Sequence, residues 1–134
     1  LILGHHAHTP KAIGVHAGKV CFYSLSTFIM SSTAKAPEEA RLFCKRYGVE
    51  LDPAYPHLAY GADAKRSLIA KATLSATGVQ RVSYLPVLID RDLRPEVLRQ
   101  GDERFDDALR FMEWVSEDMP HRFTVAGDEV LVTA

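Results

Sequence analysis

The chain has 134 residues, of which 47% are hydrophobic and 25% are charged, a composition typical of a globular protein with one hydrophobic core. Its 16 basic and 17 acidic residues give a net charge of −1 and form no basic stripe or block of like charge. This balance gives no indication of binding to nucleic acid or to an anionic membrane. No apolar stretch reaches the roughly 18 residues that a membrane-spanning helix needs. We therefore expect a single domain over residues 1–134 and no nucleic-acid partner.

Three histidines directly follow a short apolar run at the start of the chain. Residues 1–3 are strand-like and end at Gly4, and His5, His6 and His8 come next. Open α/β sheets carry their binding sites in loops at the carboxyl ends of strands, and neutral imidazole is a good ligand for Zn²⁺, Fe, Ni or Cu. The cluster therefore predicts a metal site, with leftover tag sequence as the alternative interpretation.

The spacing of the histidines assigns them different roles. In an extended segment side chains alternate, so His6 and His8 should point the same way, roughly 6.5–7 Å apart at the backbone. Two imidazoles at that separation can each reach one ion of a pair about 3.5–4 Å apart. His5 should point to the opposite side, towards the substrate or towards a group that orients a ligand. We therefore expect His6 and His8 to be metal ligands and His5 to have a catalytic role.

A hairpin and a loop are predicted next. Residues 12–16 and 19–25 alternate in hydrophobicity around an Ala-Gly turn, which is typical of a β-hairpin. Cys21 in this hairpin and Cys44 farther along are expected to be buried thiols and not a disulfide framework. Residues 26–36 are small and polar, which indicates a loop. Three apolar side chains of this loop are expected to pack on the core: Phe28, Ile29 and Met30.

Two helices are predicted, at about residues 37–47 and 102–118. The first has Pro37 in its first turn, acidic residues near its positive end, and Gly48 after its last residue. The second has Asp102 as a candidate N-cap. Each has one apolar face at helical spacing. The expected faces are Ala40, Phe43, Cys44 and Tyr47 for the first helix, and Phe105, Ala108, Leu109, Met112 and Val115, widened by Phe111 and Trp114, for the second.

The remaining segments predict two more hairpins and an aromatic loop. The loop, residues 51–63, contains Tyr55, His57 and Tyr60, which either line a pocket or anchor the loop to the core. Pro86 cannot donate to a ladder, so it should mark an edge strand or a bulge. Residues 91–100 read as a connection with some extended character. The four strands of the hairpins are expected at residues 66–75, 79–90, 123–125 and 129–133.

The sequence has no serine nucleophile elbow, phosphate-binding glycine loop or Cys-x-x-Cys pair. The segment Gly4-His-His-Ala-His8, followed by a hairpin that ends in Phe-Tyr-Ser-Leu25, resembles the last metal motif of the CapA-type bacterial capsule and poly-γ-glutamate biosynthesis proteins. These calcineurin-like metallophosphoesterases read roughly Gly-His-His-Pro-His, a short hairpin, and Phe-Tyr-Ser-Leu-Gly-Asn-Phe. Ala7 stands at the position of the proline, and Ser26 and Thr27 stand at the positions of Gly-Asn. Similarity continues downstream and covers nearly the whole chain.

The resemblance implies the C-terminal part of an α/β (α+β) metallophosphoesterase-type β-sandwich flanked by helices. It also implies a binuclear site of Mn, Fe or Zn, whose metals lower the pKa of a water that attacks a phosphoester. His8 and one of His6 or His5 would be ligands; the spacing favours His6 and leaves His5 to face the phosphate or the leaving group. The aspartate, Gly-Asp and Asn-His ligand motifs of the family precede this point. They are therefore expected upstream of Leu1, and the 134 residues alone should be catalytically inactive.

The expected function of the parent protein is that of a CapA-like metallophosphatase of capsule or poly-γ-glutamate synthesis. Its substrate would be a phosphorylated small molecule or a capsule polymer precursor. The alternative is a non-catalytic accessory or structural module of capsule synthesis or export with a degenerate metal site. The resemblance suggests a place at the bacterial cell envelope or in the cytoplasm. Separated from a larger sandwich, the chain should form a homodimer through residues 1–3 or 12–25.

Overall fold

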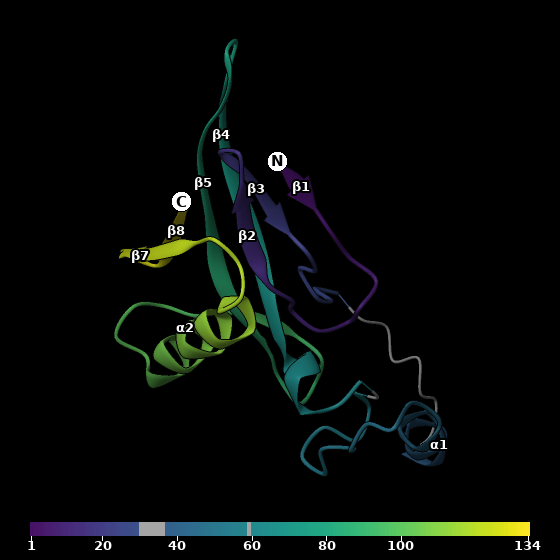
Figure 1. The fold of residues 1–134 in the computed structure, drawn as a ribbon. Helices are drawn as coiled ribbons and strands as arrows, with labels where there is room; N and C mark the ends of the chain where they lie inside the picture. Colours follow the sequence, from purple (N-terminus) through teal and green to yellow (C-terminus); the bar gives the residue numbers. More distant parts are fainter. Residues whose placement is uncertain (30–36, 59) are drawn as a thin grey trace.

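A computed structural model describes residues 1–29, 37–58 and 60–134, which form two sheets and two α-helices (Figure 1). Neither helix in this part of the chain has the length and hydrophobicity needed to cross a bilayer. The strands are β1 (Ile2–Leu3), β2 (Ile13–His16), β3 (Lys19–Phe22), β4 (Arg66–Ser75), β5 (Gly78–Ile89), β6 (Pro95–Val97), β7 (Arg122–Ala126) and β8 (Glu129–Thr133). The helices are α1 (Pro37–Tyr47), the 3₁₀ turn η1 (Ala62–Lys65) and α2 (Glu103–Ser116).

The strands are divided between a three-stranded and a five-stranded sheet. The smaller sheet has the order β1-β3-β2, in which β1 runs parallel to β3 and β2 pairs with β3 as a hairpin. The larger sheet is antiparallel, with the order β4-β5-β8-β7 and with β6 paired to β5. The predicted hairpins and the predicted α+β class are confirmed. The hairpin of β2 and β3 turns through Ala17 and Gly18, whose φ angles of 48° and 71° belong to a type I′ turn.

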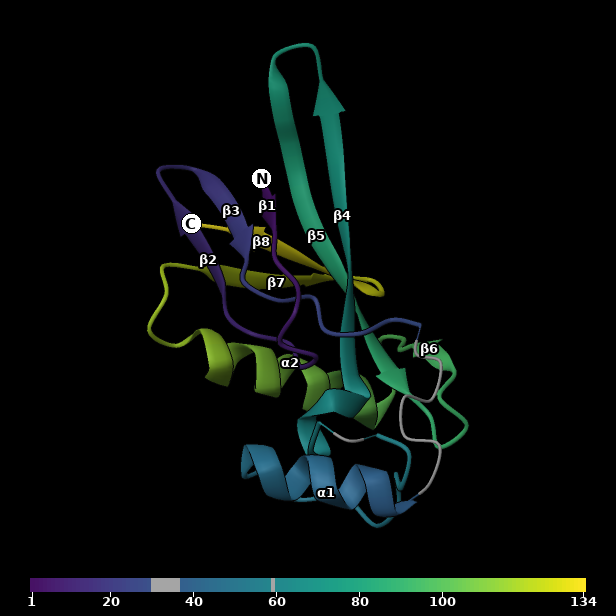
Figure 2. The ribbon, with the colours of Figure 1, turned by 90° about the vertical axis from the view of Figure 1, so that its right-hand side faces the viewer.

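One hydrophobic core joins the two sheets to α2. Along β4, β5 and β8 alternate side chains face this core, and the smaller sheet and α2 lie together over that same face (Figure 2). Farther along, the β4–β5 hairpin projects beyond the body of the molecule (Figure 2). The core consists of Ile13, Val15, Val20, Phe22, Leu68, Val82, Tyr84, Leu98, Phe105, Ala108, Met112, Val130 and Val132.

The two predicted helices are confirmed, with ends shifted by at most two residues for α2. Asp102 is the N-cap of α2, because its side chain accepts a hydrogen bond from the backbone N–H of Arg104 at 2.9 Å. Cys44 on α1 is buried as expected, whereas Cys21 is only partly buried. The expected widening of the α2 apolar face by Trp114 is wrong: this side chain is 61% exposed. Met112 faces the core, and a residue two positions farther along a helix points to the other side.

The placement of two apolar loop residues is also wrong. Phe28 and Ile29 are 40% and 81% exposed, while Met30 lies outside the described residues. Among residues 1–29, Leu25 is the last one that packs on the core. Ser26, with a φ of 71°, then turns the chain away from it.

Pro86 lies neither on an edge strand nor at a bulge, so that prediction is wrong as well. It pairs with Leu68 inside β5, and the irregular register lies elsewhere, between Thr73 and Leu74. On its other side β5 pairs with β8 through Tyr84 and with β6 only from Val87 onward. The carbonyl oxygen of Pro86 accepts from the Leu98 N–H on this side. Proline is tolerated here because its missing N–H faces the gap between two partner strands.

The first strand is paired on one side only. Leu1, Ile2 and Leu3 are 39%, 63% and 47% exposed, and β1 forms the edge of the smaller sheet. Self-association through this strand stays a prediction.

The end of α2 and the segment after it hold the smaller sheet by two hydrogen bonds from the backbone of β2. The Ile13 N–H donates to the buried Oγ of Ser116 at 3.0 Å, and the Val15 N–H donates to the carbonyl oxygen of Pro120 at 2.7 Å. These two acceptors thus satisfy backbone N–H groups on the edge of β2 that faces away from β3.

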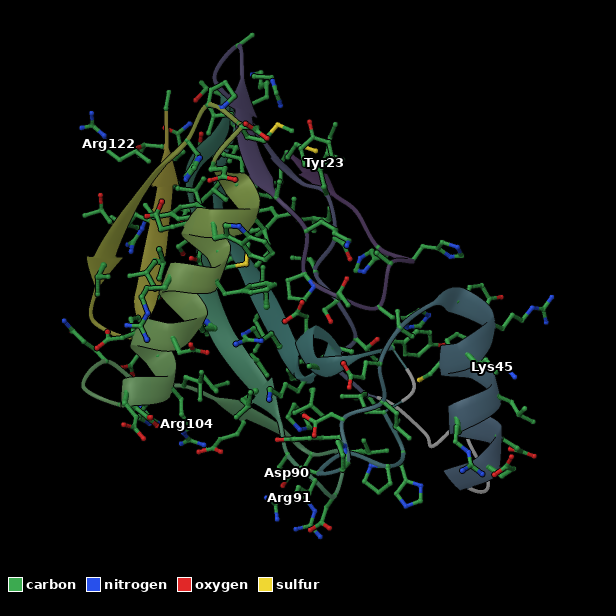
Figure 3. The ribbon with its side chains drawn as sticks, turned by 60° about the horizontal axis from the view of Figure 1, so that its bottom comes forward. Tyr23, Lys45, Asp90, Arg91, Arg104 and Arg122 are labelled. Carbon is green, nitrogen blue, oxygen red and sulfur yellow. The ribbon has the colours of Figure 1, made fainter. Side chains whose placement is uncertain are left out.

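Three carboxylates of the described chain have pKa values held below their usual range. Hydrogen bonds from Arg104 lower the pKa of both Glu96 and Asp102, at the β6 end of α2 (Figure 3). On the larger sheet, Lys71 and then Ser83 lower the pKa of Glu129 by hydrogen bonding. These groups are more easily ionised in the folded chain than in the unfolded one.

Replacing Ser116 by alanine should destabilise the protein by about 1–3 kcal/mol, because a buried N–H of Ile13 would lose its acceptor. Urea unfolding measures the change. Glu117→Ala, at the exposed C-cap residue that follows Ser116, should change the unfolding free energy by no more than about 0.5 kcal/mol. Equal effects of the two substitutions would contradict the role given to Ser116.

Acid should destabilise the fold through the carboxylates with lowered pKa. Their stabilising contribution is complete above the ordinary carboxyl pKa of about 4 and is lost as the pH falls through the lower pKa values of the folded state. Urea midpoints measured from about pH 7 to about pH 3 should therefore decline. The Glu129→Gln variant should show a shallower decline, and an equal slope in both proteins would exclude a contribution from Glu129.

Candidate functional site

The histidine loop begins at a point where two backbones approach closely. The Gly4 N–H donates to the carbonyl oxygen of Phe22 at 2.7 Å, and the Leu25 N–H donates to the carbonyl oxygen of Gly4 at 3.0 Å. A Cβ atom on Gly4 would lie 2.4 Å from the carbonyl oxygen of Tyr23, which is closer than any side chain can come. Only glycine fits, and its two hydrogen bonds bring the loop after β1 beside the loop after β3.

The loop is not extended, so the expected alternation of His6 and His8 is wrong. Their φ angles are 85° and 56°, in the left-handed region that non-glycine residues rarely adopt. Ser26 in the neighbouring loop has a φ of 71°. Such residues persist only where surrounding contacts determine them, and they gather at functional sites. Three of them therefore occur in two adjoining loops.

His8 is held by contacts from two distant segments. Its Nδ1 is hydrogen-bonded to Thr27 Oγ1 at 2.8 Å. Its ring stacks on that of Tyr60, with 4.0 Å between centroids and 11° between planes. When Nδ1–H donates to Thr27, the lone pair of Nε2 is left for another partner. His8 can then serve as a metal ligand or as a proton acceptor.

A groove of about 790 Å³ separates this loop from α1 and from the segment after it. Figure 3 shows the loop after β1 reaching towards α1, with Lys45 on the outer side of that helix. Tyr60 lines the groove, so one aromatic residue of the 51–63 loop does line a pocket. His6 and His8 also line it, whereas the exposed His5 does not. The remaining lining residues are Ala7, Thr9, Lys11, Phe43, Tyr47, Val49, Glu50, Leu51, Asp52, Pro53, Gly61, Ala62 and Asp63.

Carboxylates reach the groove from the opposite wall, but two of the three have cationic partners. Asp52 lies 3.7 Å from Lys65, and Asp63 accepts from Arg66 at 3.0 Å. Within the described residues, no group of three or more His, Cys, Asp and Glu side chains is arranged to hold a metal ion. The imidazoles are suitable donors, but they are too few to hold a pair of metal ions alone.

Comparison of the chain with family models and with curated proteins gave no match. The chemistry of the groove therefore has to be judged from its own residues. Thr27 and Tyr60 were missed as site residues by sequence reasoning. Tyr60 had a weak signal, as an aromatic residue in a long loop. The resemblance marked Thr27 as a departure that could alter a contact on the wall of the site, but it did not identify Thr27 as the partner of His8.

Ser26 occupies a position that suits glycine. Its backbone is left-handed and its Oγ is buried without a hydrogen-bond partner among the described residues. Ser26→Gly should therefore stabilise the protein by about 1 kcal/mol, since glycine adopts the left-handed backbone without strain and has no hydroxyl to bury. Ser24→Gly is the matched control and should destabilise, because the buried Ser24 Oγ accepts from the Ser26 N–H. Urea midpoints decide the sign, and a destabilised Ser26→Gly variant would contradict this account.

Proposed function

We propose that the groove around His8 is part of a metal-dependent phosphoesterase site, as in the CapA-type metallophosphatases of capsule and poly-γ-glutamate synthesis. His6 and His8 are the ligands that this chain contributes, to a binuclear Mn, Fe or Zn centre. The observation that carries the proposal is the fixed ring of His8 on the wall of the groove. The substrate is a phosphorylated small molecule or a capsule polymer precursor.

The hydrogen bond to Thr27 is what a ligating histidine requires. Metal-bound imidazoles almost always have their second nitrogen hydrogen-bonded, which fixes the tautomer and the ring. Thr27 Oγ1 takes this position at Nδ1 of His8. A half-exposed histidine that served only to pack the loop could have its ring nitrogens solvated by water and would not need the hydrogen bond to Thr27.

The backbone at Ser26 supports the resemblance independently. The CapA-type pattern has Gly-Asn where this chain has Ser26 and Thr27. A φ of 71° and a buried hydroxyl without a partner among the described residues are features of a backbone suited to glycine. The next position, Thr27, is the one that contacts His8. Ser26 and Thr27, the two residues that differ from the CapA-type pattern, thus lie beside the proposed site.

The described residues do not complete a catalytic centre, and a binuclear site would need further ligands in addition to His6 and His8. The metals would supply Lewis acidity and a nucleophilic water. Lys11 on the groove wall provides a positive charge for an anionic substrate. His5 stays a candidate catalytic residue, exposed and outside the lining of the groove. A non-catalytic accessory module with a degenerate site is the competing function.

The chain should bind Zn²⁺ weakly through His8, and the affinity should fall on acidification because protons compete for the imidazole nitrogens. His8→Ala should weaken binding at least about tenfold. His16→Ala is the control, because His16 is exposed at the β2–β3 turn and its ring contacts the hydroxyl and ring edge of Tyr23. Titration followed by histidine ring resonances gives both affinity and site.

Signals of His16, His57 or His121 that shift before those of His6 and His8 would contradict the site. Unchanged affinity in His8→Ala would favour the accessory module.

A further inference from the structure

The ring plane of His8 is set by one residue. Tyr60 lies face to face with it at 4.0 Å and 11°, a geometry in which the imidazole cannot tilt without losing the contact. Thr27 bonds to an atom in the plane of the ring and so fixes its rotation, but not its tilt. The two contacts therefore restrict different motions of the same side chain.

Tyr60 is itself held from α1. The ring of Phe43 packs edge-on against Tyr60, with 4.9 Å between centroids and 77° between planes, and Tyr47 packs against Phe43 at 4.5 Å. A series of rings thus leads from α1 across the groove wall to His8. The left-handed backbone of His8 needs such support, since it is costly without surrounding contacts.

We propose that Tyr60, held by Phe43 of α1, is the positioning residue for His8. It fixes the imidazole plane while Thr27 restricts the rotation of the ring within that plane, and in the tautomer whose Nδ1–H donates to Thr27 Oγ1 the Nε2 atom is presented to a metal ion. This inference rests on the proposed function in that His8 is taken as a ligand. Its physical basis, the orientation of the His8 ring by Tyr60, can be measured without any metal.

The test compares Tyr60→Leu, Tyr60→Phe and Tyr23→Leu in the 134-residue chain. Tyr23 is the matched control because it contacts a different histidine, His16. In Tyr60→Leu the ring protons of His8 should move downfield as the ring current of Tyr60 is lost, and Zn²⁺ affinity should fall about tenfold. Tyr60→Phe should retain both properties, because the ring and not the hydroxyl makes the contact. Tyr23→Leu should change neither.

Three outcomes would overturn the proposal. The first is that Tyr60→Leu leaves the His8 resonances unchanged, and the second is that Tyr60→Phe does not retain the original His8 resonances. The third is that Tyr60→Leu shifts the His8 resonances without changing Zn²⁺ affinity, although His8→Ala binds Zn²⁺ less well. If Tyr60→Leu does not fold, the unmodified chain decides, since the His8 ring protons must then resonate upfield of those of the exposed His5. An error in the proposed function itself would show separately, because His8→Ala would then bind Zn²⁺ as well as the unmodified chain. The His8 resonances would still report whether Tyr60 orients the ring.

Discussion

The contact of Gly4 with β3 determines where the histidine loop lies. Gly4 donates to Phe22 and accepts from Leu25, so it joins the end of β1 to the end of the neighbouring hairpin. Two loops therefore start side by side, one with the histidines and the other with Ser26 and Thr27. The hydrogen bond of His8 to Thr27 follows from this arrangement. A side chain at position 4 would separate the strands and, with them, the two loops.

The two walls of the groove rest on different parts of the fold. The histidine wall belongs to the smaller sheet, which packs on the common core and is bonded to the end of α2 through Ile13 and Val15. The other wall is formed by α1 and the segment that follows it. Phe43 and Tyr60 connect this wall to His8. The described core residues include none from α1 or from residues 48–65, and the stacking of Tyr60 on His8 links the two walls directly.

Local signals in the sequence predict most of the elements. Glycine turns and alternating hydrophobicity mark the hairpins, and Asp102 together with helical periodicity marks α2. The predictions that were wrong concern residues whose environment depends on partners far away in the sequence. The position of Pro86 is tolerated only because β8 ends and β6 begins on the same side of β5. No local pattern shows such a gap.

The site was predictable only in part, for a related reason. The histidine cluster pointed to a loop that does border the groove, but the spacing argument assumed an extended chain, whereas His6 and His8 are left-handed. Histidine adopts that conformation more often than most non-glycine residues, but the histidine spacing does not predict it, and the contacts of Gly4, Thr27 and Tyr60 that accompany it come from distant segments. A loop that served only as a connection would gain nothing from strain at His6, His8 and Ser26. Two strained loops that hold one imidazole in a fixed plane are better explained by a requirement on the orientation of that imidazole than by a purely connecting role.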